Sequence, residues 1–438
     1  MLNPPRVRER KRSIHPMKIA YCLPDQRWVE EIQGGNTTDA AHLQQKYIAE
    51  GLCARGHTIT FIAPRDFDQV MYAHPSNPLT PAPQTWTASG WFKLTGKLVW
   101  KFQQLFHIPY LNFFSNLHRF NACLHCLPGH DVAFERNSLY NSGVAMASKD
   151  LNMPYVMFFD ADQFIELDFM GKPLKGLLRW NAKRFLRYNL NTANCIICVS
   201  ESAKKHLITN WDLPSNRIIV LPNAVDVEHF KPDPKMRAET RASLRIATNP
   251  LVIFVGSFYP WHDVATLLKA FAIVLKTHTE ARLILIGDGT EREKMTVLST
   301  ELGIGHAVQF IGFVGHADVP YFVNAADIAV VPVQKMKADM WLSPMKLFEY
   351  MASGKAVVAT ASGQIKEVVK DGRNGLLVSA GDTENMAEAI GRLAADTDLG
   401  VRLGRQARED AVQNHSWEQY LSRLENVFGD VLLRKEVK

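Results

Sequence analysis

The chain has 438 residues, of which 47% are hydrophobic, and a formal net charge of +6. This length exceeds what one ordinary hydrophobic core organises, so we expect two or three domains. The composition excludes a disordered chain and a coiled coil, and no apolar run approaches the roughly 18 residues that a membrane-spanning helix needs.

The N-terminal segment MLNPPRVRERKRSIHP, residues 1–16, is basic, and we expect it to be a disordered leader. The residues that follow, MKIAYCL, form too short an apolar run for a signal peptide and are typical of a strand. We therefore expect a cytoplasmic protein.

The first half alternates short β-branched runs with helical patterns, which is typical of a parallel sheet covered by helices. The expected strands are KIAYCL, TITFIA, DVAFE, YVMFF and CIICVS, and the expected helices include residues 38–55 and 172–191. A Pro-rich stretch, HPSNPLTPAPQ, predicts an irregular surface insertion. Residues 17–222 are expected to form one doubly wound domain.

A basic, aromatic segment lies within this first half. No Asp or Glu occurs from Gln69 to His130, and residues 1–220 carry 25 Lys and Arg against 17 Asp and Glu. Lysines alternate with Trp and Phe across residues 91–107, which predicts peripheral contact with an anionic membrane or attraction to an acidic substrate. A solvated basic helix is the simpler alternative.

Two C-x-x-C pairs have a spacing that zinc sites use, Cys123 with Cys126 and Cys195 with Cys198. The second pair lies in the expected strand CIICVS, where residues three apart point to opposite faces. Buried free thiols are therefore favoured over zinc.

The second half restarts the pattern after LPNAVDVEHFKPDP, which is typical of a linker. Its expected strands are LVIFVG, RLILIG, VQFIG, IAVVP, AVVAT and GLLVS. We expect residues 223–416 to form a second doubly wound domain, with ligands at the carboxyl ends of its strands and in the crevice between the domains. The helical pattern of residues 417–438 is expected to pack back on the first domain.

The segment SPMKLFEYMASG predicts a helix capped by Ser343, with Pro344 at the first position and Gly354 at the stop. Lys346 and Glu349 are three residues apart and project from one side of it. A surface ion pair is one interpretation. The other is a nucleotide site in which Lys346 neutralises a diphosphate and Glu349 accepts hydrogen bonds from ribose hydroxyls.

Several glycines precede an expected helix or follow an expected strand, where a backbone without a side chain can approach an anion closely. Gly34 and Gly35 precede a helix that is expected to begin near Thr37, and a simple turn explains them equally well. Gly256 and Gly287 follow the first two strands of the second domain. Neither G-x-G-x-x-G nor G-x-x-x-x-G-K-[ST] occurs, so the fingerprints of dinucleotide-binding and P-loop proteins are missing.

As an ordered set, the motifs ICVSESAKKHL, VLPNAVDVEHFKP, FVGSFYPWHDVATLLKAF, LILIGDGTEREKM, FIGFVGHADVPYFVNAADIAVVP, KLFEYMASGKAVVAT and EVVKDGRNGLLV resemble a retaining glycosyltransferase of family 4. That family includes sucrose synthases and many bacterial polysaccharide and lipid glycosyltransferases. The resemblance implies the GT-B fold, in which two doubly wound, Rossmann-like α/β domains face a central cleft. It implies a nucleotide-diphosphate-sugar donor in the second domain, a sugar or lipid-linked acceptor in the first, no cofactor, no metal and no nucleic acid.

The resemblance assigns Glu349 to the ribose, residues 312–314 to the loop beside the base and Gly35 to the phosphates, and the residue patterns add further candidates. Lys346, Glu349 and His262 are the expected catalytic residues. The expected donor contacts are Gly34, Gly35, Gly256, Ser257, Gly287, Gly312, Phe313, Val314, Lys346, Leu347 and Glu349. Glu135, Arg136 and Asp160 are candidate acceptor or sugar contacts; Asp160 lies in Asp160-Ala161-Asp162, for which a polar strand end is slightly favoured over a site.

Three positions depart from the family pattern. The first Glu of the E-x7-E motif falls at Trp341, and the usual phosphate-binding Arg and Lys align with Ser257 and His262. We expect Lys346 to supply the missing positive charge and His262 to donate a further hydrogen bond. A non-catalytic sugar-nucleotide-binding protein and a GT-B UDP-sugar epimerase are the alternative functions. The base, sugar, acceptor, linkage and oligomeric state are left open.

Overall fold

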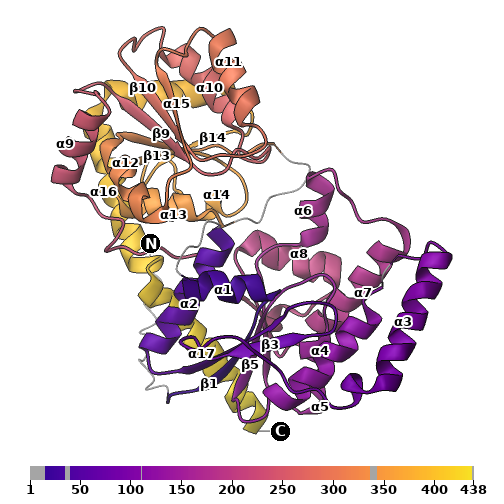
Figure 1. Ribbon diagram of the computed structural model, residues 1–438. Coiled ribbons are helices and arrows are strands. Elements are labelled where there is room, and N and C mark those ends of the chain that lie inside the picture. The colour runs from indigo at the N-terminus through magenta and orange to yellow at the C-terminus, as the bar shows by residue number, and fades with distance from the viewer. Residues whose placement is uncertain (1–14, 35–39, 110, 336–342, 437–438) are drawn as a thin grey trace.

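The computed structural model describes residues 15–34, 40–109, 111–335 and 343–436 (Figure 1). The chain forms two α/β domains, each built on one mainly parallel sheet between helices (Figure 1). The expected leader, residues 1–16, lies outside the described residues except for its last two positions. The expected architecture of two doubly wound, Rossmann-like α/β domains is confirmed.

The first domain contains an eight-stranded sheet in the order β4-β3-β2-β1-β5-β6-β7-β8. The strands are β1 (Lys18–Cys22), β2 (Thr58–Pro64), β3 (Val70–Ala73), β4 (Thr80–Pro81), β5 (Val132–Arg136), β6 (Tyr155–Phe159), β7 (Cys195–Cys198) and β8 (Ile218–Val220). All neighbours pair in parallel except β2 with β3 and β3 with β4. The Pro-rich stretch is therefore not wholly irregular, because it contains β4, an edge strand where Pro is tolerated.

Helices cover both faces of this sheet. They are α1 (Gln26–Gly34), α2 (Ala40–Ala54), α3 (Gly90–Leu105), α4 (Phe113–Cys126), α5 (Gly143–Asp150), α6 (Gln163–Phe169), α7 (Gly176–Thr192) and α8 (Glu201–Trp211), with short 3₁₀ turns η1 (Trp86–Ala88) and η2 (Ser215–Arg217). Successive strand residues enter opposite cores: Ala20 and Cys22 lie in one, Ile19 and Tyr21 in the other. Both faces are therefore buried, as the continuous apolar strands predict.

The second domain has a six-stranded, fully parallel sheet in the order β11-β10-β9-β12-β13-β14. Its strands are β9 (Leu251–Val255), β10 (Arg282–Ile286), β11 (Val308–Gly312), β12 (Ile328–Val331), β13 (Ala356–Thr360) and β14 (Leu376–Val378). Its helices are α9 (Pro234–Ser243), α10 (Val264–Val274), α11 (Arg292–Glu301), α12 (Val319–Ala325), α13 (Met345–Ala352), α14 (Ile365–Val368), α15 (Thr383–Ala395) and α16 (Thr397–Asn414), with the 3₁₀ turn η3 (His316–Asp318). All six strands expected here are present.

The last helix, α17 (Trp417–Glu436), leaves the second domain and runs along the first (Figure 1). Its Leu424 and Phe428 are fully buried in the core beside β1 and β2. Glu425 accepts a hydrogen bond from Arg55 at 2.7 Å and lies 3.0 Å from Nε2 of His57. The C-terminal segment is thus part of the first domain's core.

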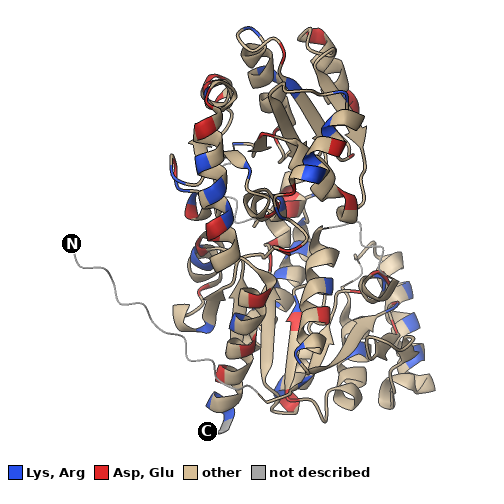
Figure 2. Cartoon of the chain, turned by 90° about the vertical axis from the view of Figure 1, so that its left-hand side faces the viewer, with Lys and Arg blue, Asp and Glu red and all other residues tan. Residues whose placement is uncertain are grey.

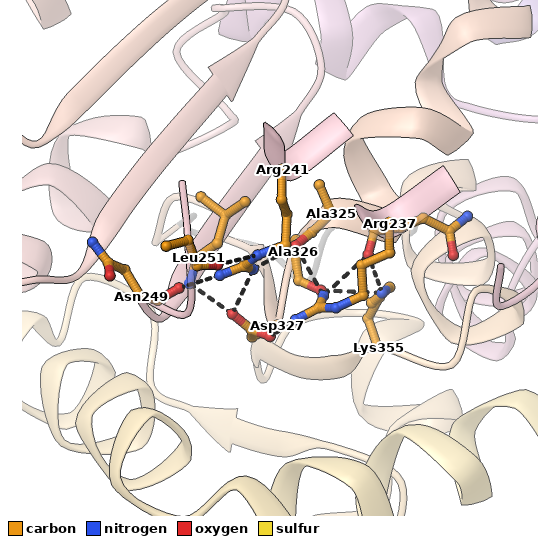
Figure 3. Close-up of polar contacts among 10 residues, drawn as sticks. Arg237, Arg241, Asn249, Leu251, Ala325, Ala326, Asp327 and Lys355 are labelled. Carbon is orange, nitrogen blue, oxygen red and sulfur yellow. Dashed lines mark hydrogen bonds and ion pairs between the residues drawn. The ribbon is translucent and has the colours of Figure 1, made fainter. Parts of the chain in front are cut away.

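Three cations at the amino-terminal edge of the second sheet secure the end of α12 (Figure 3). Arg237 donates to the carbonyls of residues 324–326, and Arg241 contacts Asp327 at 3.2 Å. The Lys355 ammonium donates to two of the same carbonyls, and burial lowers its pKa to about 7. Every cation in this cluster has partners, so we interpret the cluster as structural.

Contacts between the domains involve α8 and α14. The Glu367 carboxylate accepts from the amides of Glu201 and Ser202 at 3.2 and 3.3 Å, at the positive N-terminal end of α8. The Gln364 side chain donates to the Val199 carbonyl. Figure 1 accordingly shows α13 and α14 on the side of the second domain that faces the first, and Figure 2 shows both signs of charge distributed over both domains.

Candidate functional site

The second domain places a buried ammonium at the carboxyl ends of its strands. Lys346, in the first turn of α13, extends its Nζ to 4.2 Å from the centre of the Phe254 ring. This Nζ is buried and has no hydrogen-bond partner among the described residues. Burial lowers the pKa of Lys346 to about 7, against the opposing effect of Glu349. An unpaired buried cation is the kind of group that an anionic ligand would complete.

Gly256 makes room for this ammonium. A Cβ at Gly256 would lie 2.2 Å from the Lys346 Nζ, and the φ angle of +145° is one that side chains rarely adopt. Gly287 is equally constrained, because its Cβ would lie 2.0 Å from the Gly256 carbonyl oxygen, and its amide donates to the Gly312 carbonyl at 2.8 Å. The strand ends of β9, β10 and β11 therefore meet closely beside Lys346.

Glu349 lies one turn further along α13 and is 6% exposed. Its Oε1 accepts a hydrogen bond from Nε2 of His316 at 2.8 Å. Because Glu349 pairs with His316 and the Lys346 ammonium is buried over a ring, the interpretation of these residues as a surface ion pair is wrong. Sequence reasoning did not single out His316; its position just after the Gly312-Phe313-Val314 loop was the available signal.

The helix of the SPMKLFEYMASG segment differs from its predicted form at the start. The helix begins at Met345, and Ser343 does not cap it, because its hydroxyl accepts from the Asn223 amide at 3.0 Å. Asn223 lies in the linker, so this hydrogen bond ties the start of α13 to the linker between the domains. Gly354 has a φ of +66° and ends the helix as predicted.

His262 lies in the same pocket of side chains but is neutral. Its Nδ1 is 2.6 Å from the Ser257 carbonyl oxygen, which can only accept a hydrogen bond. Nδ1 therefore carries the ring proton and donates a hydrogen bond to this oxygen. Burial, together with the nearby charge of Lys346, lowers the pKa of His262 to about 3. The free nitrogen, Nε2, is then an acceptor, which differs from the donor role expected for this residue.

The remaining donor-site candidates are spread around this centre. Phe313 is exposed and Val314 half-buried in the loop after β11. The Leu347 side chain is in the core, and its amide donates to the Pro344 carbonyl at 3.0 Å. Gly34 is the exposed last residue of α1, whereas Gly35 and Trp341 lie outside the described residues.

In the first domain, Arg136 and Asp160 form an ion pair at the carboxyl ends of β5 and β6. The Arg136 guanidinium stacks over the Trp28 ring at 4.2 Å, and both Arg136 Nε and Asp160 Oδ1 are buried without a partner in the described part of the chain. Glu135 is different: its carboxylate accepts from Tyr155 at 2.6 Å and contacts Arg119 at 3.4 Å. Of these three candidate acceptor contacts, Arg136 and Asp160 therefore have unpartnered polar atoms that a ligand can use.

Asp162 has structural partners. It caps α6 by accepting from the Phe164 amide at 2.9 Å, and it contacts His206 and the Trp211 indole at 2.8 and 3.1 Å. The six cysteines are free thiols. Within the described ranges, no group of three His, Cys, Asp or Glu side chains is arranged to hold a metal ion.

Two family models match the chain. The model described as "Glycosyl transferases group 1" matches residues 236–410, and "Glycosyltransferase Family 4" matches residues 45–229. Together they cover every strand of the two sheets except β1, and they include the Lys346 site and the Arg136–Asp160 pair.

Curated relatives share about a quarter to a third of the aligned residues. A GDP-mannose-dependent alpha-(1-6)-phosphatidylinositol monomannoside mannosyltransferase of Mycobacterium tuberculosis is 28% identical over 213 residues, 48% of this chain and 55% of the relative. A D-inositol 3-phosphate glycosyltransferase of Corynebacterium jeikeium is 29% identical over 251 residues, 55% of this chain and 58% of the relative. The chain thus spans just over half the length of these relatives.

Two solved structures are similar in fold to this protein over nearly the whole chain. Anabaena Alr3699/HepE in complex with UDP and glucose has a TM-score of 0.67 at 20% identity, covering 94% of this chain and 99% of that one. WaaG, a glycosyltransferase involved in lipopolysaccharide biosynthesis, has a TM-score of 0.61 at 16% identity, covering 94% and 99%. At these identities the likeness establishes the fold.

Proposed function

We propose that this chain, which belongs to the group 1 glycosyltransferases and to glycosyltransferase family 4, transfers a sugar from a nucleotide-diphosphate-sugar to an acceptor with retention of anomeric configuration. The observation that carries the proposal is the buried, unpartnered ammonium of Lys346 beside Gly256. Its position at the strand ends and the N-terminal turn of α13 is where a diphosphate is expected in an open α/β sheet.

In this proposal, the diphosphate receives the Lys346 charge and Glu349 accepts hydrogen bonds from the ribose hydroxyls. The acceptor attacks on the face from which the diphosphate leaves, and the diphosphate takes the acceptor's proton. Lys346 stabilises the charge that develops on the leaving group, so the protein contributes mainly positioning and electrostatics. Neutral His262 accepts a hydrogen bond from a sugar hydroxyl through Nε2. No metal or other cofactor is invoked, and transfer should persist in a chelator.

The acceptor is placed in the first domain, at Arg136 and Asp160. Support comes from their unpartnered buried atoms at the carboxyl ends of two strands, the edge where doubly wound domains bind ligands. The relatives that use GDP-mannose and the structural neighbour with UDP make GDP and UDP donors the first to test, in the synthesis of a glycolipid, polysaccharide or other glycoconjugate.

Two measurements test this function. The melting temperature of the purified protein is first measured without ligand and with UDP, GDP or ADP. A ligand that binds only the folded state raises the stability of the protein and hence its melting temperature. Nucleoside diphosphate release from the matching sugar donor is then measured with and without acceptors. Acceptor-dependent release supports transfer. Stabilisation without release would instead identify a binding protein, and conversion of the donor sugar without net release an epimerase.

We also propose peripheral contact with anionic membrane through α3. None of its residues is buried, and Trp91 and Leu105 are 80% and 74% exposed. Lys93, Lys97 and Lys101 share this helix, which lies at the edge of the first domain away from the second (Figure 1). Each Lys near an anionic surface contributes about 1 kcal/mol, and the apolar side chains add burial in the interface. No described helix is long and apolar enough to span a membrane.

Sedimentation with liposomes tests this contact. We expect binding to vesicles that contain phosphatidylglycerol and little binding to pure phosphatidylcholine. The double variant Trp91→Ser/Lys97→Glu should lose it, whereas Val401→Ser, which removes an exposed apolar side chain from α16, should not. Equal sedimentation of the wild type with both vesicles, or of both variants, would reject α3 as the contact.

A further inference from the structure

A cavity of about 400 Å³, lined by both polar and apolar residues, lies at the carboxyl edge of the first sheet. Its walls come from the segments that follow β1, β2 and β5 and from the first turns of α4. The lining includes Gln69, Asn112 and Asn141, which carry amide side chains, and Ser138, which carries a hydroxyl, whereas the Asn116 amide is already paired with protein groups. This volume is within the range of small-molecule sites, and side chains that both donate and accept suit a ligand with several hydroxyls.

Arg119, which lines this cavity from α4, has unused hydrogen-bonding capacity. The residue is 2% exposed, and its Nη2 donates to the Leu23 carbonyl at 3.3 Å and to Glu135 at 3.4 Å. Its Nε and Nη1 are buried with no partner among the described residues. Three N–H donors of one guanidinium are therefore unmatched, which is costly for a buried charge unless a ligand completes them.

The other charges in the lining already have counter-ions. Asp25 is paired with Arg27 at 3.0 Å, and Asp66 lies 3.8 Å from Arg65. The ion partner of Arg119, Glu135, is shared with the Tyr155 hydroxyl. The cavity also opens at the N-terminal end of the fourteen-residue helix α4, where the helix dipole favours negative charge. An anionic ligand in this cavity would therefore supply the partner that the Arg119 guanidinium lacks.

We infer that this cavity holds the acceptor as an anionic glycosyl unit, a sugar that carries a carboxylate or a phosphate. Its hydroxyls contact the amide and hydroxyl side chains, and its anionic group binds Arg119. The inference rests on the proposed function, because it specifies the acceptor of that reaction. Arg119 donates to Glu135, which is followed in β5 by Arg136, so the cavity and the Arg136–Asp160 pair lie at the same carboxyl edge of the sheet but on opposite faces of it.

Calorimetric titration without any donor tests the binding itself. The probes are methyl α-D-glucuronide, glucose 6-phosphate and, as the neutral match, methyl α-D-glucoside. We expect at least one anionic probe to bind about tenfold or more tightly than the neutral one, the scale of one charge-assisted hydrogen bond. The two anionic probes distinguish a carboxylate from a phosphate. Equal affinity for all three, or no binding of any, would overturn the inference.

Three variants assign the bound probe to this cavity. Arg119→Met combined with Glu135→Gln removes both charges and so avoids an unpaired buried carboxylate, while Ser138→Trp fills the cavity and leaves Arg119 in place. Both should weaken the anionic probe at least tenfold. Arg179→Gln, at an exposed ion pair in the same domain, should not. Unchanged affinity in Ser138→Trp would overturn the assignment even if the double variant fails to fold.

The proposed function can fail separately. Donor binding and donor turnover do not enter the titration, so an inactive protein that binds the anionic probe through Arg119 would reject the transferase and keep the site. Lys346→Met guards against a phosphate probe in the donor site, since it should leave probe affinity unchanged. Loss of probe binding in Lys346→Met would place the probe there and overturn the inference.

Discussion

Replacement of Lys346 by Met should make the protein more stable and abolish most of its activity. A Lys whose pKa falls from an ordinary 10.5 to about 7 carries a cost of roughly 4–5 kcal/mol for its charged form in the empty site. Replacing buried charges by apolar side chains of similar volume has gained about 1–4 kcal/mol in other proteins. We expect a gain in that range at pH 7, because Met fills the same space over Phe254.

The catalytic loss should be large in the same variant. Removal of one preorganised group that stabilises developing charge lowers turnover by about 10²–10³. Lys346→Arg should recover only part of it, because Gly256 leaves little room around the ammonium. The assays are thermal melting and steady-state release of nucleoside diphosphate, with exposed Lys269→Met in α10 as the matched control. A variant that is less stable yet turns over at the wild-type rate would refute the reasoning.

The pH dependence of the wild type follows from the same group. The ammonium is charged below about pH 7 and neutral above it, so kcat/KM should fall as the pH rises through about 7. In Lys346→Arg the guanidinium stays charged, and this decline should disappear. A wild-type profile that is flat from pH 6 to 9 would mean that the Lys346 charge does not limit donor capture.

Three further changes have defined outcomes. Glu349→Gln should weaken nucleoside diphosphate binding about tenfold or more, as expected for loss of a charged hydrogen bond, and titration measures it. Gly256→Ala should weaken donor binding by displacing the Lys346 ammonium, whereas Gly305→Ala, with nothing within 4 Å, should not. Lys355→Met should flatten stability against pH in denaturant unfolding. Between about pH 7 and 10.5 the unfolded chain binds one more proton at Lys355, so wild-type stability rises with pH, and the variant loses about 1.4 kcal/mol per pH unit of that slope.

The fold followed from local patterns. The runs that predicted β1, β2 and β5–β7, and all six strands of the second domain, are continuous apolar segments because both faces of a parallel sheet are buried. The missed strands β3, β4 and β8 have two to four residues and lie toward the two edges of the first sheet, where β3 and β4 pair antiparallel, outside the parallel pattern. Helix α1 was not predicted either; of its residues only the last, Gly34, was singled out.

The sequence by itself determined that Lys346 and Glu349 project from one side of a helix near its N-terminus, because residues three apart in a helix are neighbours. Only the tertiary structure decided what surrounds them. Burial of the Lys346 ammonium depends on Phe254 and Gly256, about 90 residues away, and Glu349 meets His316 across 33 residues. Periodicity along a chain records which side of an element is buried, whereas partners and pKa depend on which distant surfaces meet. For the same reason the aromatic and basic residues of α3 could be seen in the sequence, but their exposure could not.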